Sequence, residues 1–173
     1  MPKRIMSMSA PEEIIENFEK KVFWYFQLMG HQKLKENWDV NAEDCYLRIE
    51  SAVERPDTSV TYRFVVTKSM CGPQMHLHGG CAATLVDNFT NVLIIAAATP
   101  GRFSDSGVSR NMRMTFLHSL PLGAEVRAIC LMINLGRRMA LARADFYDVD
   151  SGELCVIGVH EKVNMDREDV GKL

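Results

Sequence analysis

Residues 79–99 are apolar on nearly every side of the helix that their spacing predicts. One stripe of this helix carries apolar side chains at helical intervals: Ala82, Leu85, Val86, Phe89, Leu93 and Ala96. The opposite side is also apolar, with Ala83, Ile94 and Ala97. A helix of this kind is expected to be enclosed by the rest of the fold and not to lie on its surface. The Pro100-Gly101 pair that follows ends it.

Strand patterns stand on both sides of this helix. The expected strands are 46–53 and 59–68 before it, and 108–118, 125–135, 138–148 and 154–163 after it. Short separators rich in turn residues join the last four, which we expect to form an antiparallel meander. Ahead of the strands, Pro11 followed by two glutamates opens an amphipathic helix that ends near Gly30. The expected fold class is therefore α+β: a long central helix wrapped by an antiparallel sheet, with an extra N-terminal helix.

Composition places the chain among ordinary soluble proteins with one core domain. Of its 173 residues, 47% are hydrophobic and 24% are charged, and the formal net charge is −2. This balance excludes disorder, and it gives no basic field that would favour a nucleic-acid partner. The longest unbroken apolar run, 92–98, is too short for a membrane span. The five cysteines have no CxxC spacing, so neither a disulfide framework nor a zinc ribbon is indicated.

Three parts of the chain are expected. These are an N-terminal helical extension at 1–39, a central domain at 40–165 and a tail at 166–173. The first residues include Lys3 and Arg4, but two glutamates follow and no apolar leader segment is present. We therefore expect a cytoplasmic protein, with the mitochondrion as the alternative.

Asp87 is the unusual residue of the enclosed helix. A lone carboxylate among apolar side chains must be hydrogen-bonded, paired with a cation or held neutral. Two interpretations are open. Asp87 is a functional carboxylate, or it forms a polar patch with Asn88, Thr90 and Asn91 at a subunit interface or in contact with solvent.

His78, Gly79 and Gly80 stand where the chain enters this helix. The first turn of a helix presents unpaired N–H groups and the positive end of the dipole, and these stabilise negative charge on a carbonyl oxygen. Two glycines at this point permit a ligand to approach the amides closely. The alternative is that the glycines only pack tightly against a strand.

Residues 78–88, HGGCAATLVDN, resemble the helix-start signature of the hotdog-fold acyl-CoA thioesterases, in particular the phenylacetate-pathway type that includes thioesterase superfamily member 13. The resemblance covers roughly residues 40–165 in order and spacing, with further matches at 107–109, 114–116, 135–137 and 152–162. It implies a sheet wrapped around one long helix. It also implies hydrolysis of acyl-CoA thioesters to a free acid and coenzyme A, with no cofactor beyond the coenzyme A of the substrate.

The resemblance also implies roles for single residues. The backbone N–H of Gly79 would polarise the thioester carbonyl, with Gly80 beside it as a substrate-binding residue. Asp87 would be the general base that activates water or, less often, the nucleophile. Ser109 matches the serine that positions the water or the carboxylate, and His78 matches the motif histidine near the carbonyl.

Two positions depart from the family's pattern. The asparagine that stands six residues before the motif histidine falls on Gly72, and the glycine three before it falls on Met75. A neighbouring side chain such as Gln74 or His76 is a candidate substitute for the asparagine.

Four arginines are candidates for contacts with the phosphates of coenzyme A, because guanidinium groups suit phosphate geometry. Arg137 and Arg138 come first, and a basic residue follows the matching glycine in relatives. Arg110 and Arg113 come next because they lie close to Ser109 in the sequence. For each of them, a solvated surface charge is the alternative.

The spacing within the central helix predicts a second chain at the site. Gly79 and Asp87 are eight residues apart, and at 1.5 Å per residue this separates them by roughly 12 Å. A reacting group must lie about 3 Å from both the oxyanion donor and the base, so the carboxylate must come from a partner across a two-fold axis. We expect an obligate homodimer, or a tetramer as in relatives.

No metal is expected at this site. A thiolate leaves without a strong general acid, and the His76-Leu77-His78 pair has no matched third ligand. Cys71 and Cys81 flank the motif and are interpreted as packing residues. The alternative functions are an acyl-CoA-binding protein with little turnover, or another reaction on the same scaffold, such as hydration, dehydration or polyketide release.

Overall fold

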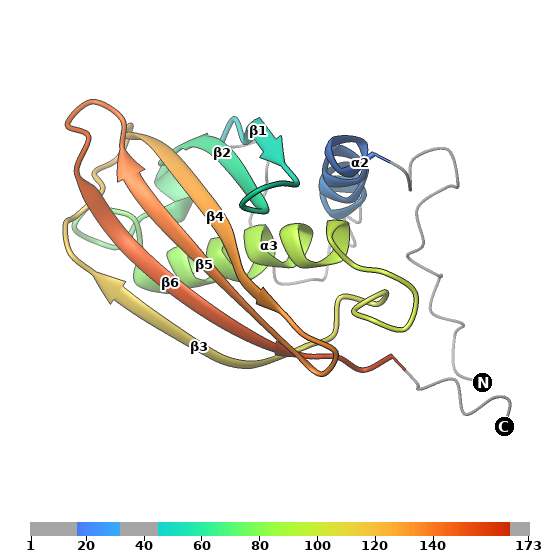
Figure 1. Ribbon diagram of the computed structural model, residues 1–173. Coiled ribbons are helices and arrows are strands. Elements are labelled where there is room, and N and C mark those ends of the chain that lie inside the picture. Colours follow the sequence, from blue (N-terminus) through green and yellow to red (C-terminus); the bar gives the residue numbers. More distant parts are fainter. Residues whose placement is uncertain (1–16, 32–44, 167–173) are drawn as a thin grey trace, which may run out of the picture.

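The computed structural model describes residues 17–31 and 45–166, which form two α-helices, one 3-10 helix and six strands. Their order along the chain is α2 (Phe18–His31), β1 (Arg48–Val53), β2 (Ser59–Val65), η1 (Lys68–Met70), α3 (Gly79–Ala96), β3 (Val108–Phe116), β4 (Glu125–Leu135), β5 (Met139–Asp148) and β6 (Leu154–Val163). The strands curve around α3, and α2 lies beside one end of that helix (Figure 1). This arrangement confirms the expected α+β fold class.

All six strands form one antiparallel sheet in the order β1-β2-β4-β5-β6-β3. The expected meander is therefore correct for β4, β5 and β6 but wrong for β3, which crosses to the far edge and pairs with β6. The reason lies in β2, which pairs with β4 along its whole length and so occupies the place beside β4. The crossover brings Ser109 of β3 opposite Lys162 of β6.

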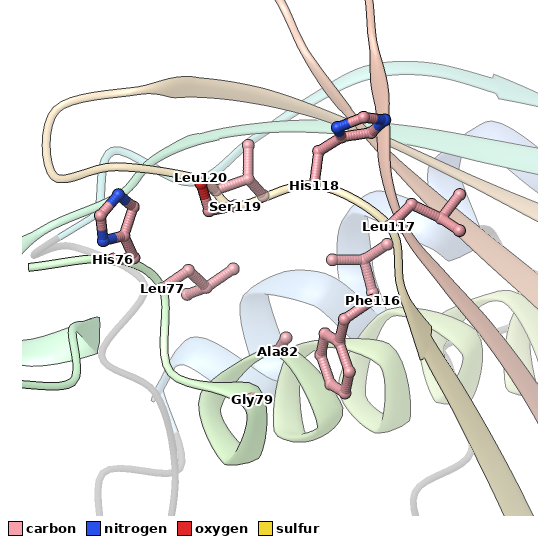
Figure 2. Close-up of a pocket in the computed structure, with 10 residues that line it drawn as sticks. His76, Leu77, Gly79, Ala82, Phe116, Leu117, His118, Ser119 and Leu120 are labelled. Atoms are coloured by element: carbon pink, nitrogen blue, oxygen red, sulfur yellow. The ribbon is translucent and has the colours of Figure 1, made fainter. Parts of the chain in front are cut away.

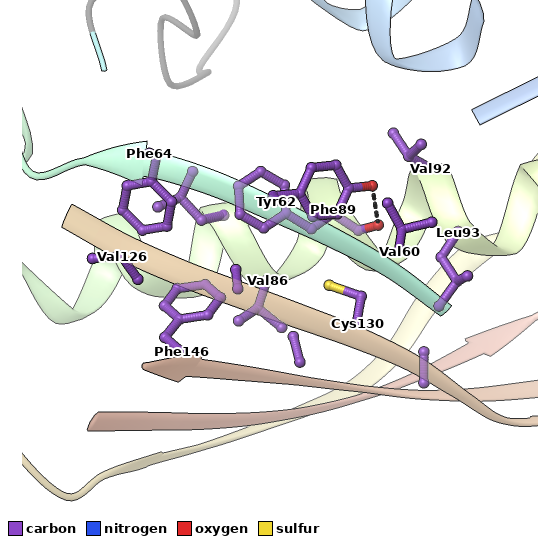
Figure 3. Packing of buried hydrophobic residues seen from close by; sticks show 14 of the residues in the cluster. Val60, Tyr62, Phe64, Val86, Phe89, Val92, Leu93, Val126, Cys130 and Phe146 are labelled. Carbon is purple, nitrogen blue, oxygen red and sulfur yellow. Dashed lines mark hydrogen bonds between the residues drawn. The ribbon is translucent and has the colours of Figure 1, made fainter. Parts of the chain in front are cut away.

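The concave face of the sheet encloses α3, as its all-round apolar pattern predicts. Tyr62 stacks on Phe89 of α3 with ring centroids 4.3 Å apart, and its hydroxyl donates to the Phe89 carbonyl at 3.2 Å (Figure 3). Phe64 and Phe146 complete the aromatic cluster over the same part of α3. Within residues 17–31 and 45–166, α3 is the one helix long and apolar enough to cross a membrane, and enclosure by the sheet accounts for this composition.

Helix α2 packs against α3 and β1 through one apolar face. Phe18, Val22 and Tyr25 are buried there at three- to four-residue intervals. Asn17 caps the helix, because its side-chain oxygen accepts the N–H of Lys20 at 3.0 Å. The expected helix opening at Pro11 lies outside the described residues.

Some element ends differ from expectation by a few residues. The central helix ends at Ala96 and not at Thr99, because Thr99 and Arg102 pair in a tight turn before β3. The second strand ends at Val65, because the chain then enters the 3-10 helix η1.

Small residues on the concave face let α3 approach the sheet closely. Ala140, Ala142 and Ala144 of β5 are buried at alternate positions, and Gly158 continues this surface on β6. A Cβ atom added at Gly158 would lie 2.7 Å from Val86 of α3. Since real Cβ atoms do not approach so closely, Gly158 fixes how near α3 lies to β6.

Gly158→Ala is expected to lower the free energy of unfolding by about 1–3 kcal/mol, because the added methyl group overpacks the contact with Val86. Urea denaturation measures this change. Gly72→Ala is the matched control, since its Cβ would lie at an ordinary 3.6 Å from His78. Equal losses of stability in the two variants would contradict the close contact.

Candidate functional site

Asp87 lies where α3, β3 and β6 meet. Its Oδ1 accepts the hydroxyl of Ser109 at 3.0 Å and lies 3.3 Å from Nε2 of His160. The Asp87 side chain is 43% exposed, whereas that of His160 is completely buried. The sequence-predicted pair of Asp87 and Ser109 is therefore brought together, in contact with solvent on one side and with a buried imidazole on the other.

His160 extends this pair into a chain of hydrogen bonds. Its Nε2 lies 2.9 Å from Ser109 Oγ, and its Nδ1 lies 2.7 Å from the hydroxyl of Thr90 on α3. Burial lowers the pKa of His160, although the charge of Asp87 acts in the opposite direction. The imidazole is therefore neutral at pH 7.

The neighbouring carboxylate selects the tautomer of this neutral ring. With its proton on Nε2, His160 donates to Ser109, and the Ser109 hydroxyl is free to donate to Asp87. In the other tautomer, the lone pair of the unprotonated Nε2 would face the lone pairs of Asp87 Oδ1, 3.3 Å away. In this arrangement His160 donates to Ser109 and Ser109 donates to Asp87, so the Ser109 hydroxyl points at the carboxylate.

The structure also accounts for the polar patch around Asp87. Thr90 bonds to His160, and Asn91 accepts a hydrogen bond from the buried ammonium of Lys162. Burial lowers the pKa of Lys162, and the charge of Asp87 opposes this effect. Asp87, Thr90 and Asn91 thus face β3 and β6 of their own chain and form one polar stripe along α3.

The start of α3 holds the second predicted group of residues. His78 is the N-cap, and its Nδ1 accepts the N–H of Gly80 at 3.1 Å. The Gly80 amide is therefore paired within the chain, whereas the N–H of Gly79 belongs to the first turn, which has no intrahelical acceptor. His78 acts here as a helix cap, a role that the sequence did not predict.

An open pocket of about 440 Å³ lies at Gly79. Its lining comes from the chain before α3, from the first turn of α3, from the end of β3 and the segment that follows it, and from β6: His76, Leu77, Gly79, Ala82, Phe116, Leu117, His118, Ser119, Leu120 and Val156. The ring of Phe116 stands against Gly79 (Figure 2), and a Cβ added at Gly79 would lie 3.2 Å from its Cζ. A larger residue at position 79 therefore requires the half-exposed ring of Phe116 to shift by a few tenths of an ångström.

The arginines fall into two groups. Arg137 and Arg138 are exposed in the β4–β5 turn, at the same end of the sheet as Ser109, because Asn164 just after β6 bonds to both of their carbonyls. Arg113 lies opposite Val159 on β6, so it alternates away from inward-facing His160 and lies on the outer face of the sheet. Arg110 is exposed and lies 3.6 Å from Glu161.

The thiols near the motif are poor nucleophiles. Burial raises the pKa of Cys71, and it raises the pKa of Cys81 to about 11. Both therefore remain protonated at neutral pH. Among residues 17–31 and 45–166, no three His, Cys, Asp or Glu side chains are arranged to hold a metal ion.

The two departures from the family's pattern lie beside the helix cap. A Cβ at Gly72 would meet Cδ2 of His78 at 3.6 Å, so a larger side chain has room to begin there. Met75 has φ 60°, the left-handed conformation that glycine adopts most easily. The chain thus keeps at Met75 the backbone that suits a glycine. His76, one candidate substitute for the missing asparagine, instead has its Nδ1 2.8 Å from the carbonyl of Gln74.

Sequence reasoning missed His160 and Lys162. A signal for them exists in β6, where Val156 and Gly158 mark the inward-facing positions of an alternating strand. His160 and Lys162 continue this alternation and therefore place two polar side chains against the enclosed helix. A polar residue at an inward strand position opposite a lone carboxylate is the pattern that would have indicated the pair.

Residues 74–155 match the family profile described as Thioesterase superfamily. A human protein named acyl-coenzyme A thioesterase 13 is 29% identical over 86 residues, which are 50% of this chain and 59% of that protein. The match therefore spans somewhat more than half of the length of that curated relative.

Solved structures show the same fold at low identity. Zebrafish thioesterase superfamily member 2 has a TM-score of 0.65 at 23% identity, covering 81% of this chain and 93% of that one. The PaaI protein from the phenylacetic acid degradation operon of E. coli has a TM-score of 0.66 at 12% identity, and the likeness covers 86% of this chain and 96% of that one. These likenesses confirm the fold that the sequence resemblance implies.

The buried His160 is expected to make stability depend on pH. Its pKa is below the ordinary value of 6.5 in the folded state, so below about pH 6.5 the unfolded chain takes up a proton that the folded chain does not. The free energy of unfolding should therefore fall as the pH drops from 7.5 towards 5. His160→Gln should flatten this slope in urea denaturation, and His118→Gln, an exposed position, should not. Parallel slopes for wild type and His160→Gln would contradict the assignment.

Proposed function

Residues 74–155 belong to the thioesterase superfamily, and on this premise we propose that the protein hydrolyses acyl-CoA thioesters to a free acid and coenzyme A. The observation that carries the proposal is the placement of Asp87, a half-exposed carboxylate oriented by Ser109 and backed by a buried neutral imidazole. Such a carboxylate can accept a proton from water while one side of it remains open to substrate.

The reaction needs a base and an oxyanion site. Asp87 removes a proton from water, and the resulting hydroxide attacks the thioester carbonyl. The Gly79 N–H, at the positive end of α3, stabilises the oxyanion that develops. The tetrahedral intermediate then expels the thiolate of coenzyme A, whose conjugate thiol has a pKa of about 8.5, so no strong general acid is required.

Ser109 and His160 orient the carboxylate of Asp87. The Ser109 hydroxyl donates to Asp87 Oδ1 and thereby leaves the other carboxylate oxygen to face water. His160 fixes the orientation of this hydroxyl from behind. In this scheme both are positioning residues, and Asp87 alone exchanges a proton with the attacking water.

The spacing of Gly79 and Asp87 supports a site shared by two chains. Both lie on the continuous helix α3, and eight residues along a helix is about 12 Å. The sheet edge formed by β3 also carries exposed apolar side chains, with Val108 51% and Phe116 54% exposed. An edge strand of this kind is suited to pair with a second copy of the chain. We infer a homodimer in which Gly79 of one chain faces Asp87 of the other, with a tetramer as a higher assembly.

The name of the human relative supports coenzyme A as the carrier of the acyl group. Arg137 and Arg138 are the favoured phosphate contacts, since both are exposed at the end of the sheet that holds Ser109. Arg113 is less favoured because it lies on the outer face. We keep the cytoplasm as the proposed location.

An acyl-CoA-binding protein with little turnover is the second candidate. Gly72 favours it, because this position lacks the side chain that the family's pattern has beside the motif histidine. Steady-state release of free thiol from a panel of short, long and aromatic acyl-CoAs separates the two. Binding without release would support the second candidate.

Asp87→Asn is expected to lower kcat/KM by about a hundredfold or more, because the amide cannot accept the proton of water. Free-thiol release measures the loss. Asp145→Asn is the matched control, since Asp145 pairs with Arg143 on the other face of the sheet and should leave the rate unchanged. An Asp87→Asn variant with full activity would exclude Asp87 as the base.

A mixing experiment is expected to reveal the shared site. Gly79→Pro removes the proposed oxyanion N–H at the first helical position, where proline is tolerated. His78 before it has φ −68° and ψ 134°, which suits a residue before proline. Each heterodimer of Gly79→Pro with Asp87→Asn contains one intact site, so re-assembly of two inactive variants at equal amounts should restore about a quarter of the wild-type activity.

The control for this experiment is native mass spectrometry of the same mixture, which reports how completely the subunits exchange because the heterodimer has a mass of its own. Recovery of activity in the doubly inactive mixture requires that the two groups come from different chains. Complete exchange with no recovery would show instead that each site lies within one chain.

A further inference from the structure

Arg102 is a partly buried cation that the sequence patterns did not single out. It lies in the tight turn between α3 and β3, where its backbone pairs with that of Thr99. Its Nε donates to the carbonyl of Gly136 at 3.2 Å. Gly136 stands directly before Arg137 and Arg138 in the β4–β5 turn. The guanidinium group of Arg102 therefore lies at the β4–β5 turn, although 34 residues separate Arg102 from Gly136 in the sequence.

Asn164, just after β6, ties these two turns together. Its Nδ2 donates to the carbonyl of Gly101 at 3.1 Å and to the carbonyl of Arg137 at 3.0 Å. Its backbone N–H donates to the carbonyl of Arg138 at 2.9 Å. Its Oδ1 accepts the N–H of Phe103, a completely buried residue, at 3.0 Å. One residue thus fixes the turn before β3 against the turn between β4 and β5.

The side chains at this junction leave guanidinium donors for a ligand. Within residues 17–31 and 45–166, the Nη atoms of Arg102 make no hydrogen bond or ion pair, and Arg138 forms no ion pair. Asp166 brings a carboxylate to the junction. Its Oδ2 accepts the N–H and the hydroxyl of Ser104, each at 2.8 Å, and its Oδ1 accepts the N–H of Asp105 at 3.4 Å. This carboxylate is therefore bonded to the loop before β3 and not to a guanidinium group.

Phosphate groups suit this arrangement. With Nε bonded to the Gly136 carbonyl, Arg102 presents its two Nη atoms, which can donate to two oxygen atoms of one phosphate. Three positive side chains on two joined turns repel one another, and a bound polyanion relieves that repulsion. Coenzyme A carries a diphosphate and a separate ribose phosphate, so it offers an anion to each turn.

The junction also lies where the phosphates of such a substrate are expected. Asn164 follows two residues after Lys162, the strand partner of Ser109. The junction is therefore at the same end of the sheet as Ser109 but beyond it. In coenzyme A the pantetheine arm separates the phosphates from the thioester, so the phosphate site must lie at a distance from Asp87.

We propose that Arg102 is a third phosphate-binding residue of the coenzyme A site, held at the β4–β5 turn by Gly136 and Asn164. The inference rests on the proposed function, since it takes coenzyme A as the carrier of the acyl group. It gives the turn between α3 and β3 a part in substrate binding. Because the two turns are already joined by hydrogen bonds, the phosphates meet arginines whose backbone is in place, and binding loses less conformational freedom.

The test compares KM and kcat for one acyl group on two carriers. Arg102→Gln removes the charge and should raise KM for the acyl-CoA about tenfold with kcat unchanged, because the lost contact is remote from the reacting carbonyl. The same acyl group on pantetheine, which has no phosphate, should give equal KM values in wild type and variant. Arg102→Lys keeps the charge without the planar fork and should lie between them. Arg143→Gln, which removes a cation from the outer face of the sheet, is the matched control and should change neither KM.

Calorimetric titration with coenzyme A and with adenosine 3′,5′-diphosphate measures binding without turnover. Arg102→Gln should weaken both about tenfold relative to wild type and to Arg143→Gln. This readout decides the role of Arg102 even if no acyl-CoA is hydrolysed. Hydrolysis by the wild type, with unchanged KM and affinity in Arg102→Gln, would overturn the proposal and leave the proposed function standing. An equal rise of KM for the pantetheine thioester would also overturn it, since the substitution would then have distorted the site in general.

Discussion

The contact between the polar stripe of α3 and strand β6 is the constraint on which the site depends. An enclosed helix can carry a carboxylate only if the surrounding sheet stabilises that group with hydrogen bonds and opposite charge. Here the hydrogen bonds and the charge come from three residues of β3 and β6: Ser109, His160 and Lys162. The crossover of β3 places Ser109 beside β6. The hydrogen bonds around Asp87 therefore depend on this strand order.

The sequence was sufficient for the fold class because its strongest signals are local. The all-round apolar pattern of 79–99 predicted an enclosed helix, and the strand patterns predicted all six strands to within three residues at each end. The place of β3 was not predicted, because a short turn after a strand normally leads to a neighbour in the sheet. Which strand lies beside β4 is decided by β2, more than 40 residues earlier in the chain.

The site was predictable only where family resemblance and local pattern coincide. Asp87 and Ser109 were predicted, and the structure brings them within 3.0 Å. His160 and Lys162 were not, because their significance depends on a pairing between residues 70 or more positions apart. The placement of His78 near the substrate carbonyl stays a prediction, and the cap that its ring forms at Gly80 of α3 was not predicted.

The position of β3 at the edge of the sheet has a consequence for how the protein behaves in dilute solution. This strand carries Ser109 at one end and Phe116, against Gly79, at the other. A second chain that pairs with β3 would therefore lie close to both Ser109 and Phe116. In the proposed homodimer, activity requires association of the two subunits, so the specific activity would fall on dilution while each chain remains folded.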